Sequence, residues 1–242
     1  MDYREVEPPA ALQMLVKAGW TLAVPADGPA WMSHWATPDG CMEIIRRLSG
    51  RSVWGGEQPE QFVAGTITRP AELRIAAGSS FVGLRIWPWT WRLLTGQSPA
   101  TLIDRWAPLN EAAPRLVMPE TVQDAFDGMG SISPPSGLVS IAAAIQSART
   151  AQEISARSGL SPRSIQRWFE RNVGQPPRSY LRMLRFSEAF ANLPSAGHGL
   201  ADHALGHGFA DQAHMSREFR ALAGSPARQV RGRAQGPFIG GK

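Results

Sequence analysis

Residues 150–173 read TAQEISARSGLSPRSIQRWFERNV, and this stretch decides the fold of the C-terminal half of the chain. Its first part, 151–158, suits a short helix, and Gly159-Leu160 suits a tight turn after it. Ser161 is a good N-cap for a second helix. Pro162 fits the first helical position because its missing N–H would be unpaired there in any case. The pattern predicts two helices joined by a short turn.

The second helix of this stretch has two unlike faces at 100° per residue. One face is apolar and consists of Ile165, Trp168, Phe169 and Val173. The opposite face is polar and consists of Arg163, Gln166, Arg167, Glu170 and Arg171. A packing face backed by guanidinium and amide groups is typical of a helix-turn-helix, whose second helix enters the major groove of DNA.

A second copy of the pattern lies downstream, at about 199–222, and reads GLADHALGHGFADQAHMSREFRAL. A helical stretch ends at Gly208-Phe209, and Asp211 can cap the helix that follows. The intervening sequence, 177–193, suits one continuous connecting helix. Two such units can present two reading helices to one DNA face, ideally about 34 Å apart, which is one turn of the duplex.

The two copies together resemble the DNA-binding domain of AraC/XylS-type transcription regulators. The first copy carries the resemblance through Ala156, Gly159, Leu160, Ser161, Arg163, Gln166, Arg167, Phe169, Gly174, Pro177, Tyr180, Leu181 and Arg185. The second carries it through Ala204, Gly208, Phe209, Asp211, Ser216, Arg217, Phe219, Gly224, Ser225 and Pro226. Three features depart from the family pattern. Met215 stands where Phe is usual, the 224–226 turn is one residue short, and Gln229-Val230 replaces Tyr-Arg.

The N-terminal half shows short runs of residues divided by turn formers, from Thr21 to about Phe81. Runs at this spacing predict a compact β domain, a barrel or a sandwich. Helices are predicted at about 10–18, 89–96, 99–109 and 119–129. In the family that the chain resembles, this half is commonly a cupin-like barrel with flanking helices that senses a ligand or dimerises. The stretches PDGCMEIIRRLSG, FVAGTITRP and VGLRIWP resemble one N-terminal domain type of that family.

The predicted fold class is therefore α+β, with a mainly-β, cupin-like N-terminal domain at 1–126. Residues 127–137 (DGMGSISPPSG) form the predicted linker, since they are rich in Gly, Ser and Pro. Residues 138–242 form the predicted all-α DNA-binding domain.

Charge is divided unevenly between the two halves. Up to Ser136 there are 11 Lys/Arg and 14 Asp/Glu, whereas from Gly137 onward there are 14 and 6. Thirteen of those 14 cations are Arg, which binds phosphate and guanine edges in a bidentate manner. The basic excess on the helical half indicates a nucleic-acid partner, although a merely soluble basic surface would have the same composition.

Several other classes of protein are disfavoured by the sequence. No apolar run approaches the roughly 20 residues that span a bilayer, and the start of the chain, MDYREVEPPA, is not a secretory signal. The lone cysteine, Cys41, excludes an internal disulfide and fits a reducing cytoplasm, where we expect the protein to reside. No Ser/His/Asp triad, phosphate loop or carboxylate pair stands out, so we predict no enzyme, no catalytic residue and no cofactor.

Base-edge contacts are expected from the two polar helix faces. By position in the family pattern these residues are Arg163, Gln166 and Arg167 in the first helix and Gln212, Ala213, His214, Ser216 and Arg217 in the second. Arg suits guanine and Gln suits adenine. Arg171 is expected to contact phosphate. The alternatives are a solvated polar face for the first set, and a grip on the DNA backbone for Ser216 and Arg217.

Eight of the nine tryptophans precede the predicted linker. Large aromatic side chains can line an apolar or cation-binding pocket, but they also fill barrel cores and dimer interfaces. The candidates for ligand binding are Trp31, Trp35, Trp87, Trp89 and Trp91.

The histidines and the single cysteine are the candidates for metal and redox chemistry. His203 and His207 stand four apart on a predicted helix, yet a zinc site would need further ligands, so no metal is predicted. Cys41 precedes an apolar strand, which favours a buried thiol over a reactive sensor.

Taken together, the sequence predicts a sequence-specific, DNA-binding transcription regulator controlled by a small effector or partner at its N-terminal domain. A homodimer is possible, and RNA polymerase would be a partner of an activator. One alternative is an N-terminal domain that only dimerises or binds protein. A less favoured one is an enzyme fused to a DNA-binding domain.

Overall fold

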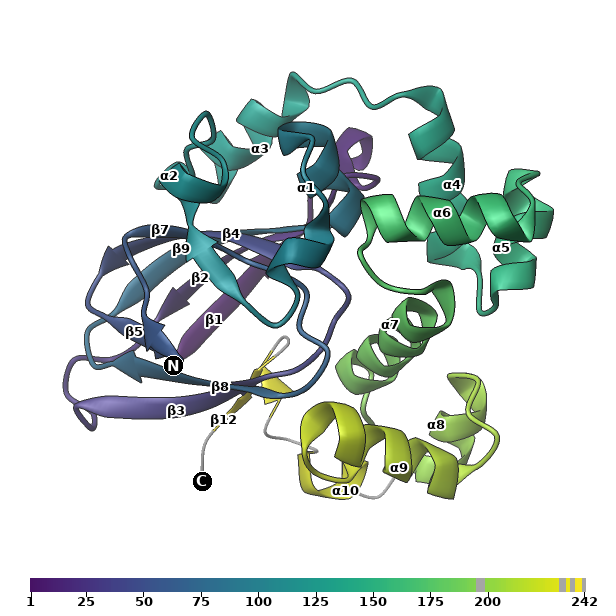
Figure 1. Ribbon diagram of the computed structural model, residues 1–242. Coiled ribbons are helices and arrows are strands. Elements are labelled where there is room, and N and C mark those ends of the chain that lie inside the picture. The colour runs from purple at the N-terminus through teal and green to yellow at the C-terminus, as the bar shows by residue number, and fades with distance from the viewer. Residues whose placement is uncertain (195–198, 231–233, 236–237, 241–242) are drawn as a thin grey trace.

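The computed structural model describes residues 1–194, 199–230, 234–235 and 238–240, in which a β-rich N-terminal half is followed by a helical C-terminal half (Figure 1). This is the predicted α+β class with a mainly-β N-terminal region, and that prediction is confirmed. In the described part of the chain, no helix has the length and apolar character needed to cross a membrane.

Two six-stranded sheets make up the β region. In spatial order the first sheet contains β1 (Asp2–Val6), β2 (Val16–Ala23), β9 (Ser80–Ile86), β4 (Met42–Ser49), β7 (Gln61–Ala64) and β10 (Trp106–Pro108). The second contains β11 (Ala234–Gln235), β12 (Phe238–Gly240), β3 (Trp31–Ala36), β8 (Ala71–Ala76), β5 (Ser52–Trp54) and β6 (Gly56–Glu57). Among the described residues, every strand pairing is antiparallel.

Strand β9 shows why the first sheet is buried on both faces. Val82, Leu84 and Ile86 alternate along it and join one apolar cluster, whereas Phe81 joins another on the opposite face. The first cluster lies under the helices of the N-terminal half, and the second lies between the two sheets. The covering helices are η1 (Ala10–Leu12), α1 (Pro88–Thr95), η2 (Pro99–Leu102), α2 (Leu109–Ala112) and α3 (Val122–Gly130).

The C-terminal half consists of two helical units joined by α7 (Figure 1). In chain order its helices are α4 (Ser136–Ser147), α5 (Ala151–Ser158), α6 (Pro162–Asn172), α7 (Pro177–Ala191), α8 (Leu200–Gly206), α9 (Gln212–Ala223) and α10 (Ala227–Val230). The units have separate apolar cores, one around Phe169 and one around Phe219, and α7 contributes to both through Tyr180 and Phe186.

The predicted start signals are present in both units. The Ser161 side chain accepts a hydrogen bond from the backbone N–H of Ser164 at 3.2 Å, and Pro162 is the first residue of α6. The Asp211 side chain accepts a hydrogen bond from the backbone N–H of His214 at 2.6 Å. Gly159 ends α5 with a φ of 70°, a backbone conformation that costs glycine little. The local sequence therefore determines where the second helix of each helix-turn-helix begins.

Two predicted helices of the N-terminal half were wrong. Residues 10–18 form the short η1 and the start of β2, because Val16 and the residues after it pair with β9. Residues 99–109 form η2 and β10. Asp104 breaks the helix with a φ of 55°, and its carboxylate accepts hydrogen bonds from the N–H and hydroxyl of Thr68 at 2.7 and 2.6 Å.

The segment predicted as a linker is partly helical. α3 runs through Gly130 and α4 begins at Ser136, so only residues 131–135 of the segment 127–137 lie outside helices. Leu138 also packs against the apolar cluster of the N-terminal half. The division of the chain at 126 and 138 stays a prediction.

Candidate DNA-reading helices and effector cavity

Helix α6 presents the predicted polar face to solvent. Arg163, Gln166, Arg167 and Arg171 are all exposed, and Ile165 and Phe169 on the other side are buried. Within the described residues, none of these three arginines has an ion-pair partner. Their guanidinium groups are therefore available to DNA phosphates or base edges.

Helix α9 offers a less uniform face. Gln212, Ala213 and Arg217 are exposed, while His214 and Ser216 are half-buried. The His214 Nδ1 accepts a hydrogen bond from the backbone N–H of Ala210 at 3.2 Å, so this nitrogen already has a partner in the turn before the helix. Among the predicted residues of this helix, Arg217 has the charge and exposure best suited to DNA.

Helix α7 holds the two units together. It contacts both α6 and α9, and Arg182 on α7 forms an ion pair with Glu218 on α9. Arg178 is exposed and Arg185 is half-buried. Helix α7 therefore lies between the two candidate reading helices and contacts both (Figure 1).

A cluster of aromatic rings joins the N-terminal half to the first helical unit. The Trp89 ring is stacked on Trp87, with centroids 5.3 Å apart, and lies 5.9 Å from the Trp168 ring of α6 and 6.5 Å from the Tyr180 ring of α7. The Trp89 indole N–H donates to the Met14 carbonyl at 2.7 Å, which fixes the ring. Since Trp168 belongs to α6, the first reading helix packs directly against the N-terminal half.

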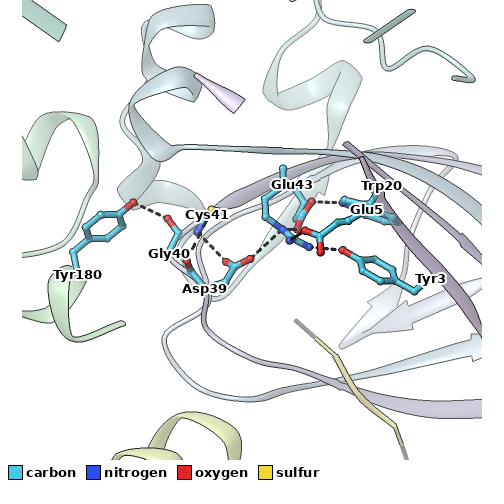
Figure 2. Close-up of polar contacts among 9 residues, drawn as sticks. Tyr3, Glu5, Trp20, Asp39, Gly40, Cys41, Glu43 and Tyr180 are labelled. Atoms are coloured by element: carbon cyan, nitrogen blue, oxygen red, sulfur yellow. Dashed lines mark hydrogen bonds and ion pairs between the residues drawn. The ribbon is translucent and has the colours of Figure 1, made fainter. Parts of the chain in front are cut away.

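A buried ion-pair network lies at one end of the first sheet (Figure 2). Arg85 on β9 is only 4% exposed, and its guanidinium contacts the carboxylates of Glu5, Asp39 and Glu43 and donates to the Tyr3 hydroxyl. Burial alone would lower the pKa of Arg85, but the carboxylates of Glu43 and Asp39 raise it well above its usual range. This guanidinium is always charged.

Glu43 connects this network to an aromatic side chain. Its carboxylate accepts hydrogen bonds from Arg85 Nε at 2.7 Å and from the Trp20 indole N–H at 2.6 Å. Burial raises the pKa of Glu43, and the neighbouring Arg85 offsets only part of that rise.

The loop Asp39-Gly40-Cys41 connects this ion-pair network to helix α7 of the C-terminal half (Figure 2). The Asp39 carboxylate binds Arg85 and also accepts the Cys41 N–H at 2.9 Å. The Tyr180 hydroxyl on α7 donates to the Gly40 carbonyl at 2.9 Å. Gly40 has a φ of 81°, and a Cβ there would lie 2.7 Å from Leu184 of α7. Only glycine allows the loop to approach the helix this closely.

A cavity of about 90 Å³ lies between the two sheets. Its apolar lining is Trp20, Leu22, Ala36, Ile45, Trp54, Phe62, Ala64, Gly65, Ile67, Ala71, Leu73, Ile75 and Phe81. Its polar lining is Thr37, Asp39, Cys41, Glu43, Ser52 and Gln58. An apolar cavity with a few polar groups is the usual form of a small-molecule site. Asp39, Cys41 and Glu43 belong both to this lining and to the network that reaches Tyr180.

None of the five tryptophans predicted for ligand binding lines this cavity. Trp87 and Trp89 are buried in the aromatic cluster beneath α6 and α7, and Trp91 is buried in the core under the first sheet. Trp31 faces outward between Arg51 and Arg74, and Trp35 is 40% exposed.

The lining tryptophans are Trp20 and Trp54. Residues 10–18 were predicted as a helix, so the strand that begins at Val16 and includes Trp20 was not predicted from the sequence. Which face of that strand meets the second sheet is set by tertiary packing.

Cysteine and histidine contribute structure. Burial raises the pKa of the Cys41 thiol well above its usual value, which keeps it protonated at neutral pH. The His203 Nε2 lies 2.9 Å from the Ala189 carbonyl, and the His207 Nδ1 lies 3.9 Å from a Glu188 carboxylate oxygen. In the described part of the chain, no group of three or more His, Cys, Asp or Glu side chains could hold a metal.

Two family models match the chain. One, described as a helix-turn-helix domain, matches residues 154–233, and the other, a domain of unknown function (DUF6597), matches residues 4–108. No curated protein sequence matches the chain.

Solved structures of ToxT from Vibrio cholerae resemble it weakly. The 1.65 Å ToxT structure is 9% identical, covers 95% of this chain and 98% of ToxT, and has a TM-score of 0.48. Wild-type ToxT with bound unsaturated fatty acid is 12% identical, covers 86% and 94%, and has a TM-score of 0.45.

Proposed function

We propose that the chain is a DNA-binding regulator and that a small effector in the N-terminal cavity controls how it binds a specific DNA site; the match of residues 154–233 to a helix-turn-helix domain supports the DNA-binding role. The observation that carries this proposal is the hydrogen bond from Tyr180 to Gly40. It joins the helix between the two reading units to a loop whose flanking residues, Asp39 and Cys41, line the cavity.

The exposed faces of α6 and α9 support the DNA-binding part of the proposal. Arg163, Gln166 and Arg167 read base edges in one major groove, and Arg217 and its neighbours enter the next. Arg171 contacts phosphate and positions α6. Gln212 and Ala213 are exposed enough to contribute, whereas His214 and Ser216 act mainly through the structure of α9.

The cavity supports the effector part. A ligand that touched Asp39, Cys41 or Glu43 would change the loop that Tyr180 holds, and so would favour one position of α7 over another. Such a switch works only if the effector binds the two arrangements with different affinity.

The proposed partners follow from this role. They are double-stranded DNA, the effector, a second copy of the chain and, for an activator, RNA polymerase. We expect the protein in the cytoplasm, where the chromosome is accessible. We propose no catalytic step.

The test has three parts. Genome-wide mapping of bound sites supplies the operator, and tryptophan fluorescence against a metabolite library supplies the effector. Operator affinity is then measured with and without that compound. We expect the compound to change operator affinity by roughly fivefold or more, the size of ordinary allosteric coupling. In the Tyr180→Phe variant we expect the compound to leave operator affinity nearly unchanged.

Thr95→Val is the matched control. It removes a hydroxyl hydrogen bond of 2.7 Å that lies within α1 and does not join the two halves. Effector control by this route is contradicted if no cavity-binding compound alters operator affinity, or if Tyr180→Phe and Thr95→Val leave the coupling equally intact.

A further inference from the structure

The cavity between the sheets has a mainly apolar lining that includes two carboxylates, and from this we propose that its ligand is a small hydrophobic amine, bound as the ammonium cation. The inference rests on the proposed effector control and gives its ligand a chemical class.

The charged side chains of the cavity lining have one sign. Asp39 and Glu43 are carboxylates, and the described lining residues include no Lys, Arg or His. Arg85, which pairs with both carboxylates, is not part of the lining. Lys17 is not part of the lining either, and its Nζ lies 5.6 Å from the centroid of the Trp87 ring. A ligand carboxylate would therefore meet two like charges and no cation at the cavity surface.

The charge balance behind the lining also favours a cation. One guanidinium, that of Arg85, contacts three carboxylates: Glu5, Asp39 and Glu43. When all are ionised, the cluster has an excess of negative charge. Burial is the largest cause that raises the pKa of Glu43, and the nearby Asp39 carboxylate raises it further. An ammonium group beside Asp39 and Glu43 would supply the missing positive charge.

A second polar group points to a ligand independently of the carboxylates. Ser52 lines the cavity and is 3% exposed, and within the described residues its Oγ has no hydrogen-bond partner. Buried hydroxyls are normally hydrogen-bonded, because an unsatisfied one loses its contacts with water without replacement. Gln58, also in the lining, is 5% exposed and its N–H donates to the Ser52 carbonyl. The Ser52 hydroxyl and the Gln58 side-chain amide offer hydrogen-bonding groups to a ligand in the cavity.

The rest of the lining suits a hydrocarbon body and the ammonium together. Trp20, Trp54, Phe62 and Phe81 contribute aromatic rings, and the Trp20 ring is fixed through its N–H to Glu43. Aromatic faces attract cations as well as apolar groups. A ligand with a hydrocarbon body and an ammonium group is therefore complementary to this lining.

Three probes of equal chain length test the proposal on the full chain: n-hexylamine, n-hexanol and n-hexanoate at pH 7, measured by calorimetry and tryptophan fluorescence. We expect hexylamine to bind about tenfold more tightly than hexanol, as a charge-assisted hydrogen bond allows. Hexanoate should bind most weakly of the three.

Two variants locate the effect. Glu43→Gln removes one lining charge, and we expect it to reduce hexylamine affinity to that of hexanol while hexanol still binds. Glu72→Gln is the matched control, because Glu72 is an exposed carboxylate on β8 outside the lining. It should leave all three affinities unchanged.

The proposed class is overturned if hexanoate or hexanol binds as tightly as hexylamine, or if none of the three binds. It is also overturned if Glu43→Gln, folded and binding hexanol, keeps the full preference for the amine. The comparison of three probes on the unaltered chain decides the matter if Glu43→Gln does not fold. Effector control is judged separately, by operator affinity with the compound found in the metabolite screen, so the failure of one proposal is distinguishable from failure of the other.

Discussion

Trp20 and Gly83 show at the residue scale how the cavity wall is built. A Cβ on Gly83 of β9 would lie 2.1 Å from the Trp20 ring, so the indole lies directly on the glycine backbone. The Trp20 indole N–H also donates to Glu43 on β4, a strand of the same sheet, at 2.6 Å. A single missing side chain thus sets the position of a lining aromatic ring.

Gly83→Ala tests this contact through stability. Because the new methyl group would overlap a ring that is 3% exposed, we expect a loss of about 1–3 kcal/mol in the free energy of unfolding, measured by urea denaturation. Gly128→Ala is the control. It lies within α3 with open space around it, and should stabilise the protein by about 0.5–1 kcal/mol. A neutral Gly83→Ala would show that the Trp20 ring is free to move.

Arg167 and Arg171 lie one turn apart on α6 and are expected to differ in what they recognise. Arg167→Ala should weaken specific operator binding more than binding to random duplex, at a cost of about 1–3 kcal/mol, because a base contact is lost. Arg171→Ala should weaken both about equally and reduce the dependence of binding on salt, because a phosphate contact is lost. Titrations of operator and random duplex at several salt concentrations check this. Equal losses in both variants would rule out the division of roles.

The C-terminal strand β12 matters at the scale of elements. Although it follows the second helix-turn-helix, it pairs with β3 of the N-terminal half, with Ile239 opposite Trp35 (Figure 1). The Ile239 side chain is 4% exposed and belongs to the apolar core of the second helical unit. The end of the chain therefore joins that unit to the second sheet, as Tyr180 joins α7 to the loop at Gly40.

Ile239→Ala measures how much this strand contributes. Loss of a buried isoleucine should destabilise the protein by about 2–5 kcal/mol, seen as a lower urea midpoint. Leu205→Ala in α8 removes a side chain of similar size that is 60% exposed, and should change stability by less than about 0.5 kcal/mol. If the two variants were equally stable, β12 would not be a packed part of the second unit.

The whole molecule couples its halves at more than one place. Trp168 of α6 packs on Trp89, and a Cβ on Gly174, just after α6, would lie 2.6 Å from the Ala100 backbone nitrogen of η2. The first reading helix, α7 and β12 thus all contact the N-terminal half. A change in the cavity can bias the reading helices through these contacts.

Reciprocity gives a test at this scale. If the effector changes operator affinity by some factor, the operator must change effector affinity by the same factor, because both measure one coupling free energy. Calorimetry of the effector with and without operator DNA should give the ratio found in the DNA titrations. Tyr180→Phe should reduce both ratios together. Unequal ratios at equilibrium would mean that a further state, such as a change in oligomerisation, contributes.

The sequence by itself determined the elements that depend on near neighbours. Ser161, Pro162 and Asp211 mark helix starts because capping acts within three residues, and the exposed arginine face of α6 follows from helical periodicity. The helix predicted at 99–109 failed because the Asp104 carboxylate binds Thr68, 36 residues away. Local patterns cannot anticipate a partner at that separation.

Only the tertiary structure decided the cavity and its link to the reading helices. Trp20 rather than Trp87 or Trp89 lines the cavity because strand pairing set which face of β2 meets the second sheet. Tyr180 lies at Gly40, 140 residues earlier in the chain, because both pack at the junction of the two halves. Contacts of this kind depend on how complete elements pack together, and no short stretch of sequence encodes that packing.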